Sequence, residues 1–113
     1  MIQAIVRFSF SSEKRAELLG ILCSIAERVR VKRGCIGCYV SQDVQDEEMV
    51  RYEELWESQE DIERHLRSDD YRKVLFVMEM SSHAPDVRFN TIEETTGMET
   101  LIRVRQEGMC RDI

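Results

Sequence analysis

The sequence predicts a single α+β domain with the element order β-α-β-β-α-β, the ferredoxin-like arrangement in which helices cover one face of an antiparallel sheet. Segments whose apolar side chains alternate predict strands, segments with apolar residues three and four positions apart predict helices, and the two kinds follow one another in that order. The length of 113 residues suits one domain with one core. We therefore expect a folded domain over residues 1–95 and a C-terminal extension over residues 96–113.

The N-terminal third predicts a strand followed by a helix. Residues 2–10 alternate, with β-branched and aromatic side chains gathered on one side. Ser11 and Ser12 offer hydroxyl groups that could cap a helix. An apolar stripe then runs at helical spacing. It comprises Ala16, Leu19, Leu22, Cys23, Ala26 and Val29. Gly34 is suited to end this helix, because glycine readily adopts the left-handed conformation found after a helix.

The middle of the chain predicts a β-hairpin and the start of a second helix. Residues 36–44 and 49–56 predict two strands joined by a polar connection. Ser58 and Asp61 resemble a capping box in which aspartate replaces the usual glutamate. We therefore expect a helix to begin directly after the third strand.

Ser68 looks like a second cap that divides this helical region in two. The apolar side of its second half comprises Tyr71, Val74, Leu75 and Met78. Pro85 closes the region, and residues 87–92 predict the fourth strand. Beyond Gly97 the pattern fits either a short helix or an added strand, and we expect a loose tail at the end.

Composition excludes several classes of partner. The formal net charge is -6, and a nucleic-acid-binding protein needs a basic face to replace condensed counterions. The same charge argues against binding to an anionic membrane surface. The N-terminus shows no signal peptide and no apolar run could span a bilayer, so we expect a cytoplasmic protein whose four cysteines are thiols.

Two short motifs resemble a known family. The first reads Glu54-Leu55-Trp56-Glu57-Ser58, then Ile62, His65-Leu66 and Ser68, and the second reads Gly34-Cys35-Ile36-Gly37. Together with the element order, they resemble the antibiotic biosynthesis monooxygenase family. The resemblance implies a homodimer in which two sheets form an α+β barrel, and a small apolar pocket between sheet and helices in each subunit. It also implies oxidation of phenols or quinols by O2 without a metal or flavin, although other members degrade haem or modify signalling molecules.

The resemblance and the strand pattern together select four candidate site residues. Tyr52, Glu54 and Trp56 share one side of the third strand by two-residue periodicity. The family likeness places Trp56 at the pocket, where its ring could stack on a flat substrate; equally, it could be a core aromatic residue. Tyr52 stands where some family oxygenases carry an Asn that orients the substrate oxygen, and a phenol could donate a similar hydrogen bond. His65 could serve as a base at neutral pH, or be a structural histidine.

Other residues leave alternatives open. Glu54 could bind substrate as a pocket acid, or form an ion pair with Arg7 or Arg88, which we favour. Cys35 and Cys38 form a C-x-x-C motif, but it enters a strand and so lacks the helix N-terminus that activates such thiols. The first strand has no Asn of the kind found in haem-degrading relatives, which argues against haem degradation.

The sequence thus predicts a monooxygenase that needs no cofactor and oxidises a small aromatic or quinol-like molecule with O2. Its catalytic residues would be His65, Trp56 and Tyr52, and Glu54 would join Trp56 and Tyr52 in binding substrate. The alternative is a dimeric module that binds a small apolar ligand without turnover.

Overall fold

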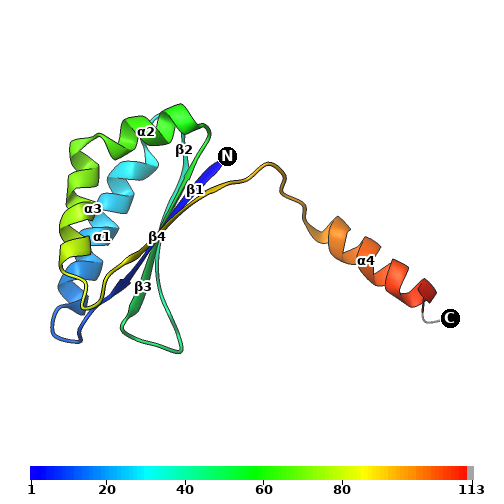
Figure 1. Cartoon of the computed structure of the whole chain (residues 1–113), viewed down its shortest axis with the longest axis horizontal. Helices are drawn as coiled ribbons and strands as arrows, with labels where there is room; N and C mark the ends of the chain where they lie inside the picture. Colours follow the sequence, from blue (N-terminus) through cyan, green and yellow to red (C-terminus); the bar gives the residue numbers. More distant parts are fainter. Residues whose placement is uncertain (112–113) are drawn as a thin grey trace.

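A computed structural model describes the backbone of residues 1–111 and the side chains of residues 1–108 (Figure 1). The loose tail expected at the end of the chain lies outside the described residues. The elements are β1 (Ile2–Ser9), α1 (Arg15–Arg30), β2 (Cys35–Gln42), β3 (Met49–Trp56), α2 (Gln59–Leu66), α3 (Asp69–Glu79), β4 (Asp86–Thr91) and α4 (Met98–Arg111).

The four strands form one antiparallel sheet in the order β2-β3-β1-β4. Helices α1, α2 and α3 all lie on one face of it, and the other face is open (Figure 1). The core fills the space between sheet and helices. Alternate residues of β1 and β3 form one side of it, and the buried sides of α1, α2 and α3 form the other. These features confirm the predicted α+β, ferredoxin-like fold, whose second and third strands form the expected hairpin.

Helix α1 differs from its prediction in two respects. Its buried side is centred on Leu18, Leu22 and Ile25, so the stripe is rotated from the predicted one and Cys23 is exposed. Several apolar residues lie on both sides of this helix, and spacing alone does not decide which side meets the sheet. Neither predicted serine caps it: the backbone carbonyl of Ser11 accepts from the first turn, and the N-cap residue is Lys14, which makes no side-chain capping bond.

Both predicted caps around α2 and α3 are confirmed. The Ser58 hydroxyl accepts from the Asp61 backbone N–H at 3.2 Å and donates to the Asp61 carboxylate at 2.8 Å. The Ser68 hydroxyl accepts from the Tyr71 N–H at 3.4 Å. On α3 the buried side includes Val77, whereas Leu75, predicted to face the core, is exposed.

After β4 the chain runs away from the domain through residues 92–97 and continues as α4 (Figure 1). This helix is the structure of the predicted C-terminal extension. Within the described residues, no helix combines the length and apolar character needed to cross a membrane.

Candidate active site

The candidate site begins with the pleat of β3. Its burial alternates strictly, so Tyr52, Glu54 and Trp56 all point toward the helices and are almost completely buried. Helix α2 passes over this end of the strand and adds His65, which is only 2% exposed. The structure therefore brings all four predicted site residues together.

Glu54 is the centre of this group. Its carboxylate accepts from the Tyr52 hydroxyl at 2.5 Å and from the Trp56 indole N–H at 3.1 Å, and one of its oxygens lies 2.8 Å from His65 Nε2. A buried carboxylate needs donors to replace the water that it loses. Tyrosine, tryptophan and histidine supply them from three directions, which explains how Glu54 tolerates 0% exposure.

The partners of His65 assign its tautomer. A carboxylate can only accept hydrogen bonds, and an ammonium can only donate them. The His65 ring lies between the Glu54 carboxylate, which faces Nε2, and the Lys32 ammonium, whose Nζ is 3.1 Å from Nδ1. A neutral ring with its proton on Nε2 satisfies both. Nδ1 then carries the lone pair. In the acid–histidine pairs of many hydrolases the acid likewise orients the ring, but it binds Nδ1 and the lone pair is on Nε2, so the two ring nitrogens have exchanged roles here.

Lys32 follows the end of α1 and is held by two further groups. Its ammonium lies 3.0 Å from the Asp70 carboxylate and donates to the Ser68 hydroxyl at 3.2 Å. Lys32 holds the pKa of the Asp70 carboxyl below its usual value, through a hydrogen bond and its charge. The ammonium therefore keeps partners even if it leaves His65.

A small cavity of about 200 Å³ opens beside this network. Trp56 and His65 form its inner wall, and their rings stack with centroids 4.8 Å apart. The remaining lining comprises Lys32, Arg33, Asp61, Arg64 and Ser68. A flat ligand in this cavity would meet an aromatic surface, a ring nitrogen and three cationic side chains.

The two buried phenols stay protonated at neutral pH. Burial, together with the charge of Glu54, raises the pKa of Tyr52 far above its ordinary value. The same two causes raise the pKa of Tyr71, whose ring meets His65 edge-on, to about 12. Tyr52 does not line the cavity, and its hydroxyl is committed to Glu54. Its predicted contact with a substrate oxygen therefore has no support in the geometry.

The ion pair that we favoured for Glu54 is wrong. Arg7 and Arg88 extend from the opposite face of the sheet, and the basic side chain within hydrogen-bond distance of Glu54 is that of His65. Sequence reasoning also missed Lys32, Ser68 and Asp70 as neighbours of the site. Ser68 was recognised as a cap and as part of the family motif, and that motif was the one signal in the sequence that could have placed it near the site.

The C-x-x-C motif has no activated thiol. Cys35 and Cys38 are free, and burial raises the pKa of both, to about 12 for Cys38. Among the side chains that the structure describes, no group of three or more His, Cys, Asp or Glu could hold a metal ion.

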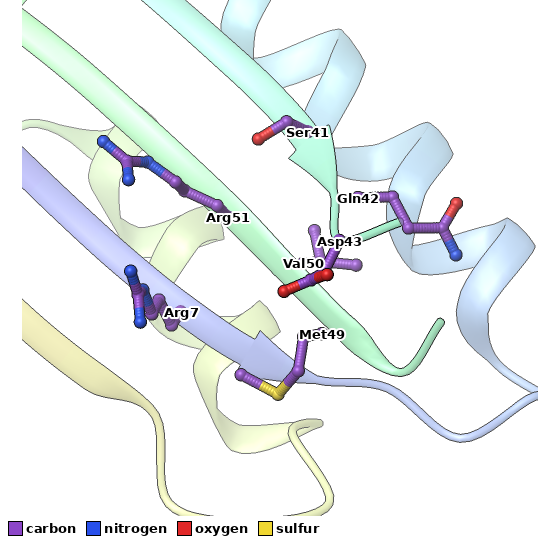
Figure 2. Close-up of a pocket in the computed structure, with 7 residues that line it drawn as sticks. All are labelled: Arg7, Ser41, Gln42, Asp43, Met49, Val50 and Arg51. Carbon is purple, nitrogen blue, oxygen red and sulfur yellow. The ribbon is translucent and has the colours of Figure 1, made fainter. Parts of the chain in front are cut away.

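A second hollow, of about 240 Å³, lies on the open face of the sheet at the hairpin end (Figure 2). Arg7 and Arg51 stand opposite one another on β1 and β3 within it. None of the four predicted site residues lines this hollow, so it is separate from the cavity beside Trp56.

The fold and site define a class: a ferredoxin-like domain with a buried acid–histidine pair next to a small cavity. The model of the antibiotic biosynthesis monooxygenase family matches residues 1–75, and the chain belongs to that family. No curated protein is detectably similar to it in sequence.

Solved structures show the same fold. A protein from Deinococcus radiodurans, provisionally described as an antibiotic biosynthesis monooxygenase, has a TM-score of 0.79 at 20% identity, covering 86% of this chain and 97% of that one. Rv0793 from Mycobacterium tuberculosis has a TM-score of 0.75 at 18% identity, covering 85% and 98%. SnoaB, a cofactor-independent oxygenase from Streptomyces nogalater, has a TM-score of 0.71 at 13% identity, covering 83% and 94%. At these identities the likeness concerns the fold.

Proposed function

We propose that this chain is a monooxygenase that oxidises a small aromatic or quinol-like molecule with O2 and needs no cofactor. The observation that carries the proposal is the Glu54–His65 pair at the cavity beside Trp56, in which Nδ1 of His65 carries a lone pair that accepts from Lys32. Membership of the family and the fold shared with SnoaB support the reaction class.

In the proposed reaction, an aromatic substrate stacks on Trp56 with its hydroxyl near Nδ1 of His65. Nδ1 takes the hydroxyl proton, and Glu54 stabilises the imidazolium that forms. The electron-rich anion then passes an electron to O2, and the two radicals combine. Their combination forms a C–O bond and gives a peroxide, which takes back the proton held by His65. Loss of the hydrogen on the same carbon as a proton then breaks the O–O bond, so that one oxygen atom stays on the product as a carbonyl and the other leaves as water.

Lys32 has a role in the same step. The Lys32 ammonium lies within hydrogen-bond distance of Nδ1 of His65, so the substrate hydroxyl must displace it. The contacts of Lys32 with Asp70 and Ser68 then keep the ammonium close to the substrate oxygen. An ammonium at this position would stabilise the developing oxyanion. Lys32 and His65 would thus act on the same substrate oxygen.

The experiment is turnover of a panel of hydroquinones and anthrone-like phenols by metal-free protein under ¹⁸O2. We expect consumption of O2 and one labelled oxygen atom in the product. If no compound in the panel is oxidised and none changes the fluorescence of Trp56, the only tryptophan, the proposal is refuted.

One observation favours a second function, a module that binds a small apolar ligand without turnover. Nδ1 and the Tyr52 hydroxyl both have partners within the protein, so neither group is free for a substrate before rearrangement. This function predicts that a ligand quenches or shifts Trp56 fluorescence and is recovered unchanged after prolonged incubation in air.

We also propose a homodimer formed through the open sheet face. Arg7 and Arg51 lie directly opposite one another on neighbouring strands, where like charges repel. Glu53 pairs with Arg51, and an acidic group from a second copy would pair with Arg7. A two-fold pair is the commonest oligomer. Light scattering should give twice the monomer mass at micromolar concentration, and a monomeric mass would contradict this arrangement.

A further inference from the structure

The cavity beside Trp56 is more highly charged than the small apolar pocket that the family likeness implies. Four of its seven lining residues have ionised side chains, namely Lys32, Arg33, Asp61 and Arg64. Three of these are cations, although the whole chain has a formal net charge of -6. Positive charge gathered in a hollow raises the local concentration of anions there. The lining therefore favours a ligand that is itself an anion.

Two of the three cations are already paired with carboxylates. The Arg64 guanidinium lies 2.7 Å from the Asp61 carboxylate, and the Lys32 ammonium lies 3.0 Å from the Asp70 carboxylate. The Arg33 guanidinium forms no ion pair or hydrogen bond with any side chain that the structure describes, so it is the unpaired charge of the lining. Because its planar donors are available, it can bind a carboxylate through two parallel hydrogen bonds without breaking an existing contact.

The backbone around Arg33 is fixed at the edge of the cavity. Arg33 lies in the turn between α1 and β2, where Gly34, with a φ of 84°, redirects the chain. The Arg33 carbonyl accepts from the Arg64 guanidinium at 3.1 Å, and the Gly34 carbonyl accepts from the Glu57 N–H at 2.9 Å. These bonds join the turn to α2 and to the segment before it. Binding an anion therefore requires the ordering of one side chain rather than of a loop.

The size of the cavity limits the aromatic part of the ligand. Its volume is about 200 Å³, and a cavity of roughly 150 Å³ is sufficient for benzene. A single substituted ring therefore fits against Trp56. We propose that the substrate is a single-ring hydroquinone bearing a carboxylate, with a hydroxyl at Nδ1 of His65 and the carboxylate bound by Arg33. This inference rests on the proposed function in taking the cavity as the substrate site.

Isothermal titration calorimetry under N2 tests the binding step without oxidation, because no O2 is present to react. The probes are homogentisate, a hydroquinone that bears an acetate group, and its amide, which has the same ring and no negative charge. We expect wild-type protein to bind the acid about fivefold more tightly than the amide, the upper range of an exposed charge contact. The net charge of the chain acts in the opposite direction, so this preference requires a local cation.

Arg33→Gln should remove the preference for the acid and leave the affinity for the amide unchanged, which also shows that the variant is folded. Arg72→Gln is the matched control, because it removes the same charge from an exposed position on α3 that does not line the cavity. It should keep the preference. Equal affinities in wild type, a preference that survives Arg33→Gln, or an equal effect of the two substitutions would overturn the proposal.

Failure of this inference can be distinguished from failure of the proposed oxidation. A preference for the acid that depends on Arg33, without consumption of O2 in air by any compound, would support the acid-binding site and count against the oxidation. Oxidation of neutral hydroquinones by a protein that binds acid and amide equally would support the oxidation and overturn the role of Arg33.

Discussion

Glu54→Gln is the substitution that most directly tests the buried network. It preserves the shape of the side chain but replaces one carboxylate oxygen by an NH2 group. If the NH2 group faces Trp56, it lies against the indole N–H, and two hydrogen-bond donors then face each other. If the NH2 group faces His65, it lies against the proton on Nε2. A shift of that proton to Nδ1 would remove this conflict but would place the proton against the Lys32 ammonium.

Either orientation leaves a buried donor without an acceptor, which costs about 1–3 kcal/mol, and weakening the remaining charge-assisted hydrogen bonds adds roughly 1 kcal/mol. We therefore expect Glu54→Gln to lower the free energy of unfolding by roughly 2–4 kcal/mol. Urea unfolding at pH 7 and fixed protein concentration, followed by circular dichroism and Trp56 fluorescence, measures this value.

The matched control is Glu53→Gln on the adjacent residue of the same strand. Glu53 points to the open face, where it pairs with Arg51 at 2.8 Å and retains partial exposure. Its substitution should cost less than about 1 kcal/mol, as for other exposed ion pairs. A difference of less than roughly 0.5 kcal/mol between the two variants would show that the buried Glu54 carboxylate contributes no more to stability than an exposed one.

Three further predictions concern the surroundings of the site. Gly34→Ala should lower the free energy of unfolding by more than about 1 kcal/mol, because Gly34 has a φ of 84° and an added Cβ would collide with the Asp61 carboxylate. An unchanged midpoint of urea unfolding would contradict this prediction. Cys38 should resist iodoacetamide at pH 8 until the protein unfolds, because its pKa of about 12 leaves almost no thiolate; rapid labelling mapped to its peptide would oppose this. Lys32 lowers the pKa of Asp70 in the folded protein, so their ion pair stabilises the fold at pH values above the pKa of Asp70 in the unfolded chain, and this stabilisation is lost as the pH falls through the pKa in the folded protein. The difference in unfolding free energy between wild type and Asp70→Asn should therefore shrink on acidification, and a difference independent of pH would contradict this prediction.

The fold was predictable from the sequence because each element carries its own local signal. Strand alternation and the hydroxyl caps at Ser58 and Ser68 depend on neighbouring residues alone, and the structure confirms them. The buried side of α1 was not predictable in the same way. Its apolar residues are spread widely around the helix, so the choice of Leu18 over Cys23 depends on the sheet that it meets.

The site was predictable only in part. Strand periodicity placed Tyr52, Glu54 and Trp56 on one side, and the structure adds His65 to them. The partners of each group depend on contacts between distant elements, which periodicity does not describe. Lys32 comes to His65 from the end of α1, 33 residues away, and it bears no motif that marks it.

The central claim is that His65, oriented by Glu54, removes a proton from a bound substrate and so starts its reaction with O2. O2 consumption by metal-free wild-type protein, His65→Gln and the exposed-site control His83→Gln, with the best compound of the panel, tests it most directly. We expect His65→Gln to lower the rate by about 10²-fold or more and His83→Gln to leave it unchanged. Equal rates for wild type and His65→Gln, with equal substrate binding by Trp56 fluorescence, would contradict it.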